Sequence, residues 1–455
     1  MQDLTTGSLS RHLLKTSSFM LASMVFQTMY VLVDLYWVSR LGTEAVAAVA
    51  VSGNFMFLVL AATQMLGVGT MTLVSHAVGA KDHARAQLVF NQAQVLSVVV
   101  GLLFLFIAMA LRMPYAEGLS ADAVTAAAAG DYLLWFIPAM ALQFGLVATG
   151  SAMRGTGAFK PGMVVQIATV VLNMVLAPAF MFGWGTGRPL GVAGTALATF
   201  VSMVVGIIWM VTYFLPATSY LKFSAALWKP RLDLWKQLLK VGLPAGGEFA
   251  LLAIYVGVIY SVSRPFGAVA QAGFGIGGRI MQALFMPAVA LGFAVAPVAG
   301  QNFGAGLGDR VRRTFTVAAG LVGSGMLVVT VGVFFGASMM MRFFTTDAQV
   351  IAVGEEYLRI VAITFVLSGV VFVSSSMFQA LGNSIPPLLT SLIRNALVIA
   401  PVLLLSGMPG FALRWVWYIA AGSTVLHITM NLLLLRREFR LRLVFPEATA
   451  QPAPL

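Results

Sequence analysis

Three things are scarce in this sequence of 455 residues: cysteine, charge and acidic side chains. Because there is no cysteine, a disulfide framework, thiol catalysis and a cysteine-based metal site are all excluded. Charged residues make up 9% of the chain, against about a quarter in soluble domains, while hydrophobic residues make up 60%. A soluble protein of this size has too little interior to bury so much apolar surface. We therefore infer that a lipid bilayer covers much of the chain.

The usual signatures of catalysis are missing as well. The sequence contains no Walker A motif, no HExxH motif and no nucleophile elbow. Gly273, Gly275 and Gly278 do fit GxGxxG, but they lie inside an apolar run with no strand before them. Close packing of helices through small residues is the better interpretation. We therefore expect no enzyme, no organic cofactor and no metal site, and a process driven by an ion gradient or by the substrate's own gradient.

Instead of charged residues, the sequence contains many long apolar segments. A helix needs about 20 mostly apolar residues to cross a bilayer. Twelve such segments are predicted, all too long for the strands of a membrane barrel. They lie near residues 14–38, 47–73, 88–111, 124–149, 162–184, 191–215, 237–262, 269–299, 315–337, 351–378, 387–407 and 414–435. The sequence thus predicts an all-α, multi-pass membrane protein whose first span is an anchor rather than a removed signal peptide.

The net charge of +12 is distributed unevenly between the loops. When loops are assigned alternately to the two sides, starting from a cytoplasmic N-terminus, 18 of the 27 Lys and Arg residues fall on the cytoplasmic side and seven on the other. The remaining two, Arg279 and Arg394, lie inside predicted spans. This bias predicts that both termini lie in the cytoplasm, and it explains the basic excess without a nucleic-acid partner. We expect the protein to lie in the cell inner (plasma) membrane.

The second half of the chain repeats the first at a constant offset. LGTEAVAAVAVSG (41–53) aligns with FGAVAQAGFGIGG (266–278), and the same offset aligns HAVGA (76–80) with QNFGA (301–305). Each half holds six predicted spans, so both halves have the same orientation and are related by a pseudo-two-fold axis along the membrane normal. We expect an N-lobe at 1–215, a cytoplasmic linker at 216–236, a C-lobe at 237–440 and a tail at 441–455.

Only two of the 15 acidic residues lie well inside predicted spans: Asp34 and Glu248. An ionisable group within a membrane is costly, and it is therefore a candidate functional residue. The alternative for Asp34 is a carboxylate that reaches the interface. The alternative for Glu248 is a structural ion pair with Arg279 of the next span. Asn173 and Thr195, also within spans, are either ligands or residues that hydrogen-bond one helix to another.

These segments resemble the multidrug and toxic compound extrusion (MATE) family, prokaryotic type. That family's first-helix acid and the turn after it have their match in LVDLYWVSRLGTEAVAAVA, and its LVSQ-x-x-GA in LVSHAVGA, where His76 replaces the usual Gln. Further matches follow in order: MRGTGAFKP, GVAGTALAT, GLPAGGE, AGFGIGGRI and GQNFGAG. The resemblance implies two six-helix lobes in a V shape, and an antiporter that exports cationic or amphipathic organic compounds in exchange for H+ or Na+.

The resemblance also implies site residues. Asp34, Asn173 and Thr195 match an ion-coupling set in the N-lobe, and Glu248 matches a seventh-helix acid that is a candidate for substrate or cation binding. Members of this type often carry a second acid four residues after the Asn, where this chain has Ala177. A sodium cage of several carboxylates is therefore disfavoured, and we expect protons to act at Asp34.

The sequence is also compatible with two other functions. A flippase for a lipid-linked precursor would need a strongly cationic cavity, for which the spans offer only Arg279 and Arg394. A channel or a receptor would not need the repeat that relates the two halves, whereas a transporter with two like lobes does. The expected partners are small organic cations or amphipathic drugs and membrane lipid, and the expected state is a monomer.

Overall fold

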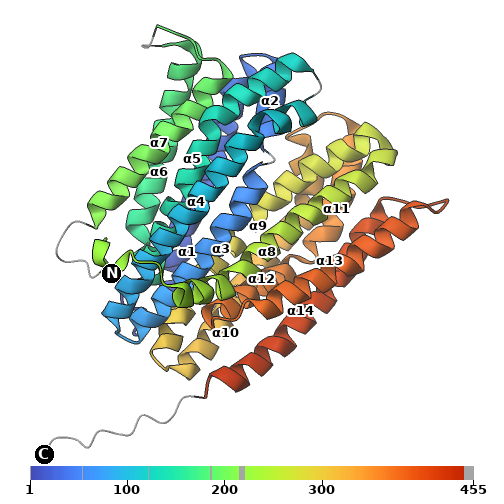
Figure 1. Ribbon diagram of the computed structural model, residues 1–455. Coiled ribbons are helices and arrows are strands. Elements are labelled where there is room, and N and C mark those ends of the chain that lie inside the picture. The colour runs from blue at the N-terminus through green and yellow to red at the C-terminus, as the bar shows by residue number, and fades with distance from the viewer. Residues whose placement is uncertain (1, 54, 121, 185–186, 215–220, 445–455) are drawn as a thin grey trace, which may run out of the picture.

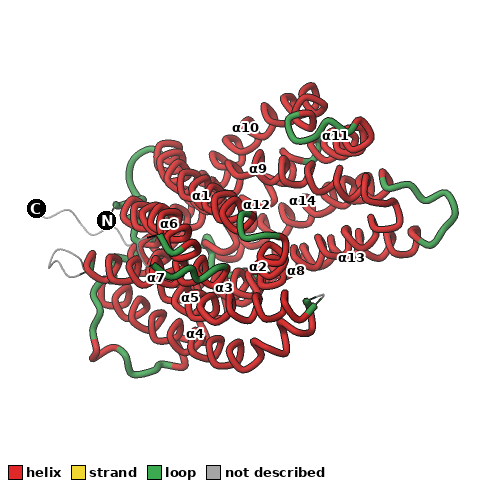
Figure 2. Tube along the Cα trace, turned by 90° about the horizontal axis from the view of Figure 1, so that it is seen from above, coloured by secondary structure: helices red, strands yellow, loops and turns green. Residues whose placement is uncertain are grey.

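The computed structural model describes residues 2–53, 55–120, 122–184, 187–214 and 221–444, and the regular structure in these ranges is entirely helical (Figures 1 and 2). The helices of the N-lobe are α1 (Leu9–Ser39), α2 (Thr43–Gly53), α3 (Phe55–Gly79), α4 (His83–Leu119), α5 (Ala123–Gly155), α6 (Phe159–Phe182) and α7 (Val192–Tyr213). Those of the C-lobe are α8 (Leu232–Ser263), α9 (Gly267–Gly304), α10 (Gly308–Arg342), α11 (Ala348–Ala362), α12 (Phe365–Ala380), α13 (Ile385–Ser406) and α14 (Arg414–Arg442). Two short 3-10 helices, η1 (Ala225–Leu227) and η2 (Arg264–Phe266), precede and follow α8.

The predicted spans correspond to these helices. Within the described residues, ten helical stretches are long and apolar enough to cross a membrane, and the pair α11 and α12, bent by 55°, forms an eleventh. One of the ten, Leu232–Gly304, contains both α8 and α9, which brings the number to the twelve predicted. The second predicted span covers parts of α2 and α3, which lie on either side of residue 54, outside the described residues. The outer faces are apolar, as contact with lipid requires: Val328 is 73% and Phe335 80% exposed.

Hydrogen bonds between distant segments show which helix ends meet. Gln2 N–H donates to the carbonyl of Thr156 after α5, Asn302 of α9 donates to Leu4, and Arg442 of α14 donates to the carbonyl of Leu381 after α12. Further bonds join the end of α3 to that of α12, the end of α9 to that of α5, and the starts of α4 and α10 to α8 and α9. The starts of α1, α4, α8 and α10 and the ends of α3, α5, α9, α12 and α14 therefore gather at one end of the bundle. We call it the basic end, because these segments and their loops carry the larger group of Lys and Arg residues.

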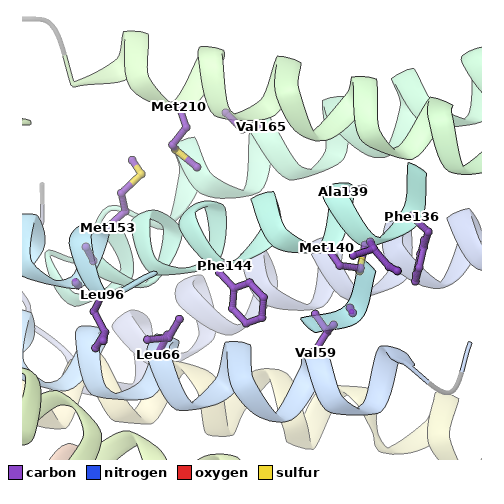
Figure 3. Packing of buried hydrophobic residues seen from close by; sticks show 14 of the residues in the cluster. Val59, Leu66, Leu96, Phe136, Ala139, Met140, Phe144, Met153, Val165 and Met210 are labelled. Carbon is purple, nitrogen blue, oxygen red and sulfur yellow. The ribbon is translucent and has the colours of Figure 1, made fainter. Parts of the chain in front are cut away.

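Each lobe has its own apolar core. In the N-lobe α5 packs against α3, α4 and α7, and Phe144 and Leu66 lie in the centre of this cluster (Figure 3). In the C-lobe α9 packs against α10, α11 and α12. The first helix of each lobe also crosses over at the basic end: Leu13 of α1 joins the core of the C-lobe, and Leu238 of α8 joins that of the N-lobe.

Glycines allow the lobes to approach closely along α3 and α8. A Cβ on Gly69 would overlap the carbonyl of Leu238, and one on Gly242 would overlap the carbonyl of Met65. In the GxGxxG stretch of α9, Gly273 serves close packing, whereas Gly278 has no atom within 4 Å of an added Cβ. A Cβ on Gly273 would lie 2.8 Å from the side chain of Val353 in α11.

The two remaining predicted segments lie partly outside the described residues. The linker 216–236 is described from residue 221 onward, and the tail 441–455 is described only to residue 444. The described part of the linker is held by two buried amides of α4. Asn91 binds the backbone of Lys222 and Ser224, and Gln92 binds the backbone of Leu227, Lys229 and Arg231.

Candidate functional site

Several acids near the helix ends have structural partners. Asp82, Asp122 and Asp347 cap the first turns of α4, α5 and α11. At Asp122 the hydrogen bonds from the backbone and side chain of Thr125 hold the pKa of the carboxyl below its usual value. Within the described residues three ion pairs form: Glu355 with Arg359, Glu356 with Arg414, and Glu438 with Arg442. Asp34 and Glu248 belong to neither group.

Asp34 lies in α1, five residues before the helix ends at the side opposite the basic end. Its Oδ1 atom is buried and has no hydrogen-bond partner within the described residues. Tyr30, one turn earlier, and Tyr132 of α5 lie within electrostatic reach of the carboxylate. A buried carboxylate oxygen without a donor is costly, and a bound proton or cation removes that cost.

A chain of hydrogen bonds extends from Tyr30 to α6 and α7. The hydroxyl groups of Tyr30 and Thr199 are 3.3 Å apart, and Asn173 Nδ2 donates to Thr199 Oγ1 at 3.0 Å. Thr199 itself donates to the backbone carbonyl of Thr195, so Tyr30 is the donor in its contact with Thr199. The single phenolic proton of Tyr30 is thereby used. Asn173 Oδ1, like the Asp34 oxygen, is buried without a hydrogen-bond partner in the described structure.

The sequence-predicted N-lobe residues thus lie in one region, with one change in how they connect. The hydroxyl of Thr195 donates to the carbonyl of Val192 within its own helix, and Thr199 makes the side-chain link to Asn173. The i, i+4 spacing of the two threonines on α7 was the only sequence signal for Thr199. Ala177, in place of a second acid, is buried at 1% exposure.

Glu248 lies in the middle of α8 and is held by neutral donors. Its Oε1 accepts hydrogen bonds from Ser375 of α12 at 3.2 Å and from Ser391 of α13 at 3.3 Å. The side chain of Gln379 lies near the carboxyl group and lines a cavity beside it. The alternative partner, Arg279, is exposed, and Glu248 belongs to none of the ion pairs of the described residues. The ion pair with Arg279 therefore does not form, because α9 turns the guanidinium outward.

A cavity of about 240 Å³ lies beside Glu248 within the C-lobe. Its wall is formed by α8, α9, α12, α13 and α14, with Val68 contributed by α3. Phenylalanines alternate with hydroxyl and amide side chains around it. A cavity that combines aromatic walls with a few polar groups is typical of sites for small organic molecules.

The two acids are not equivalent in the repeat. The offset that places His76 on Gln301 also places Asp34 on Ile259, which is 1% exposed, and Glu248 on Ser23. The lobes therefore share a fold but differ in where they hold negative charge. Among the described residues no group of three His, Asp or Glu side chains is arranged as a metal site.

Comparisons with known proteins agree with this architecture. A sequence model of the MatE family matches residues 20–179 and 244–405, one block in each half. The multidrug export protein MepA of Staphylococcus aureus (strain MSSA476) is 24% identical over 421 residues, which cover 92% of each chain. The probable multidrug resistance protein YoeA of Bacillus subtilis (strain 168) is 26% identical over 379 residues, covering 82% of this chain and 81% of that one.

Solved structures share the fold. A multidrug resistance MATE family transporter in an outward-facing conformation superposes with a TM-score of 0.89 at 23% identity, covering 97% of this chain and 98% of that one. A MATE crystal structure in the bent conformation gives a TM-score of 0.90 at 23% identity, over 96% of this chain and 97% of that one. The family match spans most of the chain, and its members are transporters. The chain belongs to the MatE family and is a multi-pass membrane transporter rather than an enzyme.

Proposed function

We propose that the protein is a secondary antiporter that exports small cationic or amphipathic organic compounds in exchange for protons. The observation that carries the proposal is the Asp34 carboxylate of α1, whose Oδ1 atom is buried without a partner in the described structure, one turn from the chain of neutral hydrogen-bonding groups that begins at Tyr30. The relatives MepA and YoeA carry names that refer to multidrug export and resistance, which supports the substrate class.

Protons are favoured over Na+ by the chemistry of the N-lobe cluster. Hard cations are bound by several oxygen ligands, commonly with more than one carboxylate. Here one carboxylate lies near Tyr30 and Tyr132, and Ala177 stands where a second acid would add negative charge. A proton needs a single basic oxygen, which Asp34 supplies. No organic cofactor is part of this proposal.

The exchange would use alternating access of the two lobes. In this conformation the close contacts between the lobes are at the basic end, where α3 meets α8 and α9. With that end on the cytoplasmic side of the inner membrane, this conformation is closed toward the cytoplasm, and both termini are cytoplasmic. We propose that a single chain, with lobes at 1–215 and 237–440, carries out the cycle. Glu248 would contribute to substrate binding in the C-lobe.

Transport into proteoliposomes tests the proposal. A fluorescent organic cation is followed while a pH gradient and a Na+ gradient are imposed separately across the same membranes. We expect the pH gradient alone to drive movement against the concentration of the cation. Transport of the organic cation driven only by the Na+ gradient would identify Na+ as the coupling ion in place of the proton. Transport that responds to neither gradient would rule out antiport with either ion.

A further inference from the structure

The cavity beside Glu248 also holds two basic side chains, Arg394 of α13 and His427 of α14. Arg394 belongs to none of the three ion pairs of the described residues. Its guanidinium lies over the Tyr255 ring, 5.1 Å from the ring centroid. Because a guanidinium carries five N–H donors, this arrangement leaves donors available for an acidic group in the cavity.

His427 supplies a second, independent sign of a ligand. The residue is 7% exposed, lines the same cavity, and has a buried Nε2 atom without a hydrogen-bond partner within the described residues. Its ring lies within electrostatic reach of Arg394. In the tautomer that carries the proton on Nε2, this atom is a donor without an acceptor among the described residues. We call Arg394 and His427 the basic pair.

Arg394 is separated from Glu248 both along α8 and along α13. Tyr255, which lies under Arg394, follows Glu248 by seven residues on the same face of α8, about 10 Å along the axis. On α13 Ser391, which binds Glu248, precedes Arg394 by three residues, about 5 Å. The opposite charges share one cavity without forming an ion pair.

We propose that this cavity binds a zwitterionic compound with an aromatic body. Its ammonium group would lie at Glu248, its carboxylate or other acid group at the basic pair, and its ring between Phe249, Phe285 and Phe372. The volume of about 240 Å³ suits a single aromatic ring with short substituents. This inference rests on the proposed function and narrows its substrate class.

The charges of the cavity favour a zwitterion over a simple cation. A monocation beside Glu248 is repelled by Arg394 and offers no acceptor to the donors of the basic pair. A ligand with charges about 5–10 Å apart satisfies both ends. Removal of its acid group should therefore weaken binding, although the ligand becomes more cationic.

The test is a comparison of two ligands that differ only in the acid group. The probe is a phenyl ring with an aminoethyl group and, para to it, a carboxyethyl group, and its partner is the methyl ester. Binding of both is measured by titration calorimetry with the full chain in lipid nanodiscs. We expect the acid to bind about tenfold more tightly, as expected for charge-assisted hydrogen bonds.

Variants test which residues cause the preference for the acid over the ester. Arg394→Gln should bring the two affinities within about twofold, and Arg394→Lys should retain part of the preference. Glu248→Gln should weaken both ligands alike. Arg279→Gln is the matched control, since Arg279 lies on the exposed face of α9. Partial misfolding lowers the number of sites for both ligands equally, so the ratio of affinities reports the site itself.

Equal affinities of acid and ester in the wild type, or no binding of either, would overturn the inference. So would an Arg394→Gln variant that keeps the full preference. Transport of the two ligands in proteoliposomes separates this inference from the proposed function. If the ester is exported and the acid is not preferred, the antiporter proposal stands and the zwitterion site is refuted. If the acid binds more tightly than the ester but no gradient drives transport of either ligand, the zwitterion site stands and the antiporter proposal is refuted.

Discussion

His76 and Gln301 are equivalent positions in the two lobes, and each donates a hydrogen bond to a backbone carbonyl of the opposite lobe. His76 Nε2 lies 2.6 Å from the oxygen of Ala380 at the end of α12, and Gln301 Nε2 lies 2.8 Å from that of Gly155 at the end of α5. The two acceptors, Gly155 and Ala380, are related by the same offset as the two donors. The pair forms a pseudo-symmetric latch between the lobes at the basic end.

We predict that His76→Ala and Gln301→Ala each increase opening at the basic end. A hydrogen bond contributes about 1 kcal/mol net, so the population of the opened state should rise roughly fivefold. The chain has no cysteine, so a single Ser75→Cys substitution is a clean reporter. Ser75 is 0% exposed and lies against Gly300 of the other lobe. The measurement is the rate at which a maleimide labels this cysteine.

The control for the latch is His76→Gln, which gives both lobes the same amide. It should keep the labelling rate near that of the parent, because an amide also donates to a carbonyl. Unchanged labelling in both alanine variants would show that these two bonds do not hold the lobes together.

The crossing of α3 and α9 beside the latch yields a second prediction. A Cβ on Gly79 would overlap the carbonyl of Gln301, and one on Gly304 would overlap that of His76. Gly79→Ala should therefore cost about 1–3 kcal/mol and lower the thermal unfolding temperature or open the basic end. Gly278→Ala, within α9 and with no atom within 4 Å of the added Cβ, is the matched control. Equal effects of the two would contradict the close crossing.

The latch shows what the sequence can and cannot predict. The constant offset alone identifies His76 and Gln301 as equivalent, and the spans predicted from hydropathy, 47–73 and 269–299, end two or three residues before them. Their acceptors are backbone carbonyls, which exist at every residue and leave no sequence signal. Which carbonyl is reached depends on the rotation and crossing angle of α12 and α5, and these follow from packing between helices.

The same reasoning explains the outcome at the candidate sites. Asp34 and Glu248 were predictable because a carboxylate in an apolar run is costly and rare. Thr199 was not, since a threonine within a membrane helix often bonds its own backbone, as Thr195 does. The neutral donors around Glu248 come from α12 and α13, far away in sequence. Spacing within one helix gives its faces but does not say what each face meets.

Glu248 allows a prediction that separates function from stability. Glu248→Gln keeps the shape and most hydrogen bonds of the side chain but removes the charge. We expect transport of a cationic substrate to fall at least tenfold, while the amount and the melting temperature of the folded protein change little. The two readouts are transport per folded molecule and a thermal melt. Unchanged transport with less folded protein would indicate a structural role.

Topology is open to a direct test. Reporter fusions after Gly306 and at the C-terminus should read cytoplasmic, and one near Arg188 should read periplasmic. The expectation follows from the gathering of Gln2, Gly155 and Gln301 at the basic end, together with the excess of Lys and Arg there. A periplasmic reading at the C-terminus would invert the proposed orientation.

Substitution of the two threonines of α7 tests whether Thr199 or Thr195 takes part in proton coupling in the N-lobe. Thr199→Val removes the hydroxyl that joins Tyr30 to Asn173, whereas Thr195→Val removes only a bond to the backbone of its own helix. We expect the first change to slow proton-driven transport several-fold and the second to have a smaller effect. Rates measured in parallel in proteoliposomes decide the matter. The reverse order would mean that Thr195 contacts the ion in another conformation.

Asp34→Asn is the decisive change for the coupling mechanism. A proton arriving from outside would neutralise Asp34, weaken its attraction for a cationic substrate and favour release, so the amide imitates the protonated state permanently. Proton-driven export should therefore fall below about a tenth of the wild-type rate. Folding should be retained, because the buried Oδ1 has no hydrogen-bond partner to lose within the described structure. The membrane potential adds about 2.3 kcal/mol per charge at 100 mV to the wild-type cycle, and Asp34→Asn should lose this dependence as well. Equal rates in the same liposomes would make the carboxylate structural.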